Sequence, residues 1–190
     1  FLDTASQAYD VVILNAPPPL TIGSNRFYTD GFFEKVKENL SKGGIFSLRL
    51  PASGNYLDEK SRMLYSTIMN TLERHFSYTR LVPGYHNYFI SSDSPVDDKI
   101  TVRIEEDSIQ TIYVNRWYLD DARMDRRASA ILAELDPDAR INTDFRPLAS
   151  YLGILRWLGM FRVPAWIVAM IPILIMLFLL LRLSPVNTGL

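Results

Sequence analysis

Apolar and polar positions near the start of the chain form three successive blocks. Two apolar runs, residues 11–14 and 45–50, flank the stretch 29–40, in which apolar side chains recur at helical spacing. Gly43 follows and supplies the left-handed residue that ends such a helix. Apolar runs on either side of a helix are typical of parallel strands covered on both faces. The pattern therefore predicts a βαβ unit with two buried strands.

A second set of elements follows the βαβ unit. Residues 58–75 repeat apolar side chains on one helical face, and the short runs 78–82 and 88–91 are strand-like. Pro83 and Gly84 lie between these runs and favour a turn, so an antiparallel hairpin is expected. Among doubly wound folds, a parallel sheet that ends in such a hairpin matches the class I methyltransferase-like sheet. We therefore predict an α/β chain that forms the C-terminal half of a Rossmann-like, doubly wound sheet.

The remaining residues divide by composition into four segments after this partial domain at residues 1–99. An extension of mixed strand and helix is predicted at 100–147, and an amphipathic helix at a membrane surface is predicted at 148–162. The span 163–182 contains 19 consecutive residues without an ionisable side chain, about 29 Å of helix. This length predicts a transmembrane helix, which is followed by a tail at 183–190.

Composition and charge exclude several classes of function. The chain has 190 residues and a formal net charge of −1, which gives no basic face for nucleic acid. It has no cysteine and two histidines, so disulfides and a cysteine-rich zinc site are excluded, and no metal site is expected. More arginines precede the predicted transmembrane helix than follow it, which places the globular part in the cytoplasm by the positive-inside rule.

The candidate chemistry lies at the carboxyl ends of the two predicted parallel strands, because open parallel sheets bind ligands in the crevice beyond these ends. The first strand ends at Asn15, and the loop 51–56 follows the second strand at the same rim. Asn15 is thus a candidate for substrate positioning, although it could equally be a simple strand end. Asn25, Arg26 and Tyr28 lie in a segment that is either a gate over this site or an ordinary loop and helix cap.

Three stretches of the sequence are similar to the spermidine synthase family, the polyamine aminopropyltransferases. They are YDVVILNAPPP from Tyr9, NRFYTDGFFEKVKENLSKGG from Asn25 and LRLPASGNY from Leu48. The later stretch INTDFRPLASYLGILRW, from Ile141, resembles the junction in the bacterial branch of the family in which a synthase-like domain is fused to membrane helices. The similarity covers most of residues 9–160 and depends on the order and spacing of these stretches.

This resemblance implies a methyltransferase-like fold that binds decarboxylated S-adenosylmethionine as a co-substrate and transfers its aminopropyl group to the amine of putrescine. In the family, one aspartate at the strand end acts on the attacking amine, and a second, three residues later, helps to hold the polyamine. Asn15 and Pro18 occupy these positions here, so the charge complement for a diamine is lost. The cofactor-binding residues are unknown and are expected before Phe1, because the Gly-rich loop of such folds has no counterpart in this sequence.

We therefore predict a membrane-anchored, spermidine synthase-like transferase at the bacterial inner membrane. Asn15 is its catalytic candidate, and Pro18, Asn25, Arg26 and Tyr28 are its substrate-binding or gate candidates. The expected partners are a lipid bilayer and a polyamine or another small amine, with a homodimer left open, and no tightly bound cofactor is expected. Two alternatives remain: a methyltransferase that uses S-adenosylmethionine, and a non-catalytic domain that senses a ligand and is attached to transport helices.

Overall fold

The computed structural model describes residues 8–52, 57–97, 99–161 and 165–183. The chain forms two compact units, Phe1–Gly153 and Ile154–Leu190, and each is described by itself. The predictions for the first seven residues, for loop residues 53–56 and for the tail from 184 lie outside the described residues. The boundaries predicted for the five segments 1–99, 100–147, 148–162, 163–182 and 183–190 are not tested by the structure and stay predictions.

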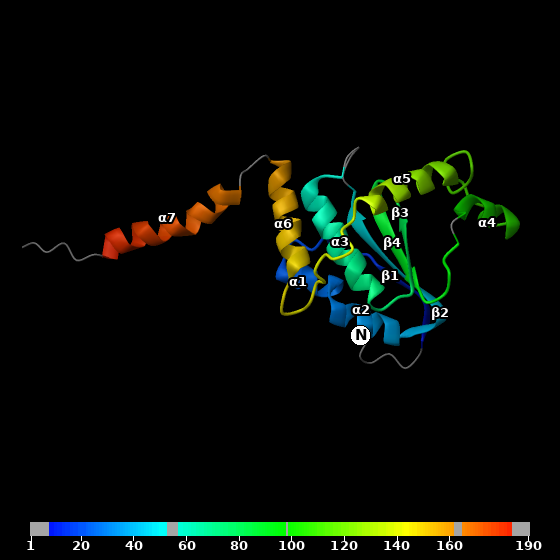
Figure 1. The fold of residues 1–190 in the computed structure, drawn as a ribbon, viewed down its shortest axis with the longest axis horizontal. Coiled ribbons are helices and arrows are strands. Elements are labelled where there is room, and N and C mark those ends of the chain that lie inside the picture. Colours follow the sequence, from blue (N-terminus) through cyan, green and yellow to red (C-terminus); the bar gives the residue numbers. More distant parts are fainter. Residues whose placement is uncertain (1–7, 53–56, 98, 162–164, 184–190) are drawn as a thin grey trace, which may run out of the picture. The chain divides into compact units, whose positions relative to one another are not determined.

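A four-stranded mixed sheet forms the centre of the first unit (Figure 1). β1 and β2 are parallel, whereas β4 runs antiparallel to both of its neighbours, β2 and β3. The predicted parallel pair and the terminal antiparallel hairpin are therefore confirmed. In the order in which they lie across the sheet, the strands are β1 (Tyr9–Leu14), β2 (Leu40–Pro51), β4 (His86–Ser92) and β3 (Tyr78–Val82).

Seven α-helices and one 3₁₀ helix occur in the described residues. They are α1 (Ile22–Asn25), η2 (Arg26–Tyr28, the 3₁₀ helix), α2 (Asp30–Glu38), α3 (Glu59–Glu73), α4 (Ile100–Glu106), α5 (Asp121–Ala133), α6 (Leu148–Met160) and α7 (Ala165–Leu183). In the segment predicted to mix strand and helix, the described residues form α4, α5 and an isolated β-bridge between Thr143 and Arg146.

Helices α2 and α3 pack on one face of the sheet and bury it. The ring of Phe33 in α2 lies 5.6 Å from that of Phe46 in β2, and the ring of Tyr65 in α3 lies 5.8 Å from that of Phe89 in β4. All four side chains are fully buried. Because burying one large apolar side chain contributes about 1.5–3 kcal/mol, this layer is the main source of stability in the unit.

The opposite face of the sheet is open at β1, which corrects the prediction of strands buried on both sides. Val11 is 54% exposed and Ile13 is 72% exposed. Along β2, buried residues alternate with half-buried ones from Gly44 to Pro51. This alternation follows from strand geometry, because successive side chains point to opposite faces. Around Val11 and Ile13, the predicted second layer is missing from the described residues.

The junction between α2 and β2 also differs from the prediction. α2 ends at Glu38, and β2 begins at Leu40, before the predicted start of the strand. Gly43 has a positive φ of 77°, as predicted, but it lies inside β2, where the register of β1 against β2 shifts. Sequence pattern alone does not separate a helix end from a strand bulge, because a left-handed glycine is typical of both.

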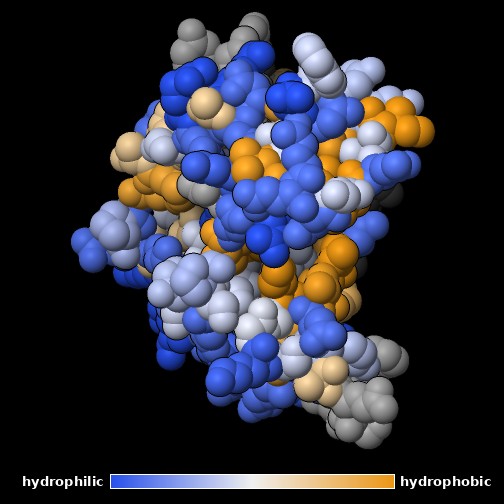
Figure 2. All heavy atoms as spheres, turned by 90° about the vertical axis from the view of Figure 1, so that its right-hand side faces the viewer, coloured by the Kyte–Doolittle hydropathy of each residue, from blue (hydrophilic) through white to orange (hydrophobic). Residues whose placement is uncertain are grey.

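The segment that joins α4 to α5 carries exposed apolar and aromatic side chains. Ile112 is 76% exposed and Trp117 is 85% exposed. Figure 2 views the molecule from the side of α4 and shows a mostly hydrophilic surface with separate hydrophobic patches. Scattered exposed apolar residues are normal on protein surfaces, so they indicate no binding site by themselves.

The second unit contains the end of α6 and the whole of α7. α7 is one helix with Pro172 inside it, and its described apolar side chains, such as Leu177, are exposed. Across the described ranges, no helix combines the length and the apolar character needed to cross a membrane. The predicted transmembrane helix at 163–182 is therefore not confirmed. The helix observed there begins at Ala165, and the first two residues of the predicted span lie outside the described residues.

Candidate functional site

The carboxyl ends of β1 and β2 meet the amino end of β4 at one rim of the sheet. Antiparallel pairing places His86, at the start of β4, opposite Pro51, at the end of β2. A cavity of about 250 Å³ lies at this rim. Open α/β sheets bind their ligands at this place in the fold. The residues that line the cavity are Asn15, Ala16, Pro17, Pro18, Arg49, Pro51 and His86.

Asn15 and Pro18 lie together in the wall of this cavity. Asn15 is exposed and Pro18 is half-buried, so the Asn15 amide is accessible to a ligand. An amide donates and accepts hydrogen bonds, but it carries no charge and does not act as a base near neutral pH. The Asn15 side chain therefore offers hydrogen bonds to a ligand in the cavity and does not accept a proton from it. A catalytic role for Asn15 stays a prediction.

Arg49 lines the same cavity and was not singled out from the sequence. Its neighbours along β2, Leu48 and Leu50, are buried on the face that α2 and α3 cover. Arg49 therefore points to the opposite face, where it is half-buried. The sequence did hold a signal, because a single charge inside a largely apolar strand marks the side chain that faces away from the core.

His86 is a second cavity residue that sequence reasoning missed. It is half-buried, and its ring contacts those of Tyr85 and Tyr88, with centroids 5.0 and 6.5 Å away. Tyr85 is 92% exposed, so this aromatic group continues from the cavity to the surface. The position of His86 follows from the hairpin, which returns the chain to the rim.

Tyr28 holds the loop of residues 16–19 that follows β1, here called the proline loop, and is not among the residues that line the cavity. Its hydroxyl donates to the carbonyl oxygen of Pro17 at 3.0 Å and lies 3.4 Å from that of Ala16. Burial raises the pKa of Tyr28 to about 12, and the positive charge of Arg49 opposes that rise. Tyr28 is therefore a neutral donor at ordinary pH. It fixes the backbone that carries Asn15 and Pro18.

Asn25 is likewise a buried structural residue, and Arg26 is exposed; neither lines the cavity. The Asn25 Oδ1 atom accepts from the backbone N–H of Ser150, and the Oδ1 atom of Asn142 accepts from that of Ala149, both at 3.1 Å. These bonds satisfy N–H groups in the first turn of α6 that have no partner within the helix. Sequence reasoning missed Asn142. A gate or substrate-binding role for Pro18, Asn25, Arg26 and Tyr28 stays a prediction.

Helix α6 packs directly against the proline loop at Gly153. A methyl group on this residue would lie 2.5 Å from the carbonyl oxygen of Pro19 and 3.4 Å from the side chain of Leu20. Pro19 is buried, so it has little room to move away. Glycine is therefore required for this close approach.

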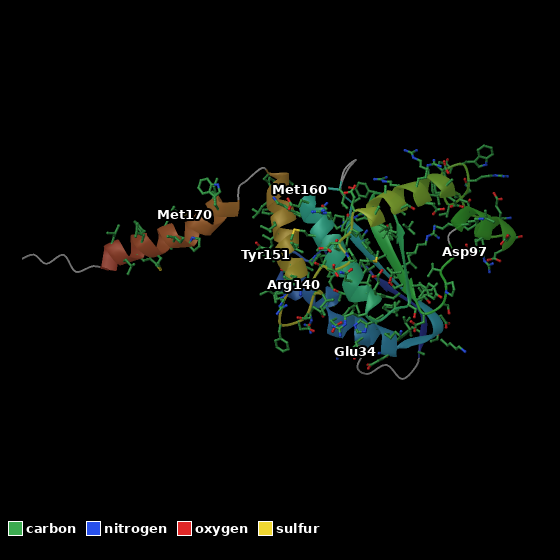
Figure 3. The ribbon with its side chains drawn as sticks, viewed as in Figure 1. Glu34, Asp97, Arg140, Tyr151, Met160 and Met170 are labelled. Atoms are coloured by element: carbon green, nitrogen blue, oxygen red, sulfur yellow. The ribbon has the colours of Figure 1, made fainter. Side chains whose placement is uncertain are left out.

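A larger cavity, of about 540 Å³, lies between α3, residues 136–140 and the start of α6. Arg140 and Tyr151 line it, and Figure 3 labels Tyr151 on α6 and Arg140 near the same helix. Asp136 and Asp138 also line it, so its walls carry both signs of charge. We take the smaller cavity as the candidate site, because it lies at the strand ends and contains Asn15, whereas volume alone does not indicate chemistry.

The described part of the chain holds no cluster of side chains that is typical of a metal centre. The described residues contain no group of three or more histidine, aspartate or glutamate side chains that could hold a metal ion. Of the described residues that line the rim cavity, His86 offers an imidazole nitrogen and Asn15 an amide oxygen as metal ligands, and neither Asp nor Glu is among them.

Several of the solved structures that match this chain are spermidine synthases. The enzyme from Thermotoga maritima matches with a TM-score of 0.50 and 16% identity, over 70% of this chain and 46% of that one. A spermidine synthase in complex with the transition-state analogue AdoDATO matches with a TM-score of 0.48 and 15% identity, over 70% and 45%. A probable spermidine synthase from Corynebacterium glutamicum ATCC 13032 matches with a TM-score of 0.43 and 16% identity, over 75% of this chain and 50% of that one.

This likeness is limited in identity and in coverage. The chain spans about half the length of the structures that it matches. No protein-family model matches the sequence, and no curated protein matches it either. At 16% identity, the likeness to the Thermotoga maritima enzyme is evidence for the fold alone. The mixed α/β sheet of this chain resembles, at low identity, part of the spermidine synthase fold.

Proposed function

We propose that this chain is part of a spermidine synthase-like transferase, which moves an aminopropyl group from decarboxylated S-adenosylmethionine to an amine. One observation carries the proposal: a cavity lined by Asn15 and Pro18 lies beyond β1, in a sheet that resembles part of the spermidine synthase fold. In the transfer, the lone pair of the amine attacks the propyl carbon bound to the sulfonium sulfur. The carbon–sulfur bond breaks with its electrons moving to sulfur, a neutral thioether leaves, and the amine releases a proton.

Asn15 would orient the attacking amine in this reaction. Its Oδ1 atom accepts a hydrogen bond from the amine N–H and directs the nitrogen lone pair. Because an amide does not take up the released proton, that proton passes to water. We therefore expect transfer to be slow at neutral pH and to accelerate as the pH approaches the pKa of the acceptor amine.

The test uses the full-length gene product that carries residues 1–190, together with decarboxylated S-adenosylmethionine and a panel of amines. It measures the thioether nucleoside and the aminopropylated amine by mass spectrometry. Asn15→Asp supplies a carboxylate at the strand end and should raise the rate by about 10²-fold. Asn115→Asp, outside the cavity, is the matched control and should leave the rate unchanged. If neither the native chain nor Asn15→Asp forms product or binds the nucleotide, the transferase proposal is rejected.

A second candidate is a domain that binds a ligand without turnover. It is favoured by the described residues that line the rim cavity, which include Asn15 and Pro18 and no carboxylate. Such a domain would bind a small ligand at the rim with an affinity measurable by calorimetry, and would yield no thioether nucleoside under any of the conditions above.

We also propose that the second unit associates with a lipid bilayer, at the bacterial inner membrane, with the first unit in the cytoplasm. The support is the row of exposed apolar side chains on α7, for example Leu174 and Leu177. Flotation of the full chain with liposomes tests this proposal. The double variant Leu174→Lys and Leu177→Lys should abolish flotation, and flotation that both forms share would reject a role for this helix.

A further inference from the structure

The rim cavity carries a positive charge in its wall, whereas a diamine, which is itself positively charged, needs a negative one. Of the seven described residues that line the cavity, only Arg49 is permanently charged, and no aspartate or glutamate is among them. A site that binds two ammonium groups normally supplies carboxylates, because a desolvated charge needs a compensating one. An ammonium group in this cavity would instead meet the guanidinium of Arg49.

Arg49 has no carboxylate partner among the described residues. In the described part of the chain, the Arg49 guanidinium forms no ion pair and no hydrogen bond, although the side chain is half-buried. Its charge also acts on Tyr28, which holds the proline loop, so the guanidinium lies close to the cavity wall. A guanidinium presents a planar fork of N–H donors that fits a carboxylate through two parallel hydrogen bonds.

His86 and Asn15 add further N–H donors to the same cavity. Arg49 pairs with Tyr88, and Pro51 pairs with His86, so the imidazole and the guanidinium lie on the same face of the sheet. A neutral imidazole offers one N–H donor, and a side-chain amide offers two. The cavity therefore combines three donor side chains without an opposing carboxylate.

We infer that the acceptor bound at this rim is an amine that also carries a carboxylate, and that Arg49 binds the carboxylate while Asn15 orients the amine. The inference rests on the proposed function for the site and names its substrate class. A cavity of about 250 Å³ fits an acceptor of a few heavy atoms. Arg49 is then a specificity-determining residue, because its charge favours an amino acid-like acceptor and repels a diamine.

The experiment is isothermal titration of the full chain with 4-aminobutyrate, putrescine and inorganic phosphate. The first two molecules have the same number of carbons and differ in the charge at one end. We expect 4-aminobutyrate to bind at least about tenfold more tightly than putrescine, and Arg49→Met to remove that preference. Arg103→Met, on exposed α4, removes the same charge elsewhere and should change neither affinity.

A second variant keeps the test independent of how Arg49→Met folds. Pro18→Asp adds a carboxylate to the half-buried loop in the same wall, so it should weaken 4-aminobutyrate binding and strengthen putrescine binding. Putrescine binding as tight as that of 4-aminobutyrate in the native chain, or no binding of either, would overturn the inference. Binding of phosphate without 4-aminobutyrate would overturn the assignment of a carboxylate.

The transfer assay separates this inference from the proposed function. Tight binding of 4-aminobutyrate that depends on Arg49, without any thioether nucleoside, would reject the transferase and leave the anion site standing. Transfer to putrescine but not to 4-aminobutyrate would support the transferase and overturn the inferred substrate class.

Discussion

The side-chain amide of Asn142 donates to Oδ1 of Asn25 over 3.2 Å, and both residues are buried. The same amide donates to the carbonyl oxygen of Tyr28 at 2.8 Å. The backbone N–H of Asn142 donates to Thr71 Oγ1 at 2.9 Å, so this one residue joins α3, α6 and the segment before α2. Asn142 thus holds Tyr28, which supports the proline loop, although it is not among the described residues that line the cavity.

Asn142→Ala should destabilise the first unit strongly. The change removes the acceptor of the Ala149 N–H, the donor to the Tyr28 carbonyl and one of the two donors to Asn25 Oδ1, all in a buried place, at a cost of about 2–4 kcal/mol. Urea denaturation followed by circular dichroism measures the loss. Asn115→Ala is the matched control: that side chain bonds in an exposed loop, and its loss should cost less than about 1 kcal/mol. Equal losses for the two variants would show that the buried network contributes little.

Tyr28 should make the protein lose stability in alkali. An unfolded tyrosine ionises near pH 10, whereas burial raises the pKa of Tyr28 to about 12, so between these values ionisation favours the unfolded chain. The contribution of the neutral Tyr28 hydroxyl to the free energy of unfolding is fully present below pH 10. It is lost as the pH rises to 12, by about 1.4 kcal/mol per pH unit. Denaturant unfolding at pH steps from 8 to 12 measures this loss.

Tyr28→Phe separates this effect from the titration of other groups. The variant should lose about 1 kcal/mol at neutral pH, because it lacks the hydrogen bond to Pro17, and its alkaline loss should be smaller than that of the native chain. Tyr85→Phe, at a fully accessible position, should keep the native profile. An identical alkaline slope in native and Tyr28→Phe proteins would contradict the assignment.

Gly153→Ala tests the contact between α6 and the proline loop. The added methyl group would overlap the carbonyl of Pro19, so we expect a loss of about 1–3 kcal/mol in the free energy of unfolding. Because the loop carries Asn15, ligand binding at the rim should weaken as well. Gly23→Ala, also in a helix, meets only an ordinary contact of 3.7 Å and should be close to neutral. A neutral Gly153→Ala would mean that the loop moves away freely.

Periodicity and turn residues were enough to predict the strands and their hairpin, because these features depend on local sequence. The place of Asn15 and Pro18 at the rim followed from fold geometry, in which strand ends meet the ligand crevice. The burial of Asn25 could not be predicted in this way, because its partner Asn142 is 117 residues away and neither belongs to an apolar pattern. Long-range polar contacts of this kind leave no periodic signal.

The open face of β1 gives the last prediction. Ile13 is 72% exposed, whereas Ile68 in α3 is fully buried. Ile13→Ala should therefore cost less than about 0.5 kcal/mol, and Ile68→Ala should cost about 2–5 kcal/mol, because only the second leaves a cavity in a packed core. Denaturant unfolding of both variants at several protein concentrations measures this difference. A large, concentration-dependent loss for Ile13→Ala would contradict an open face and would indicate that a second copy of the chain covers it in solution.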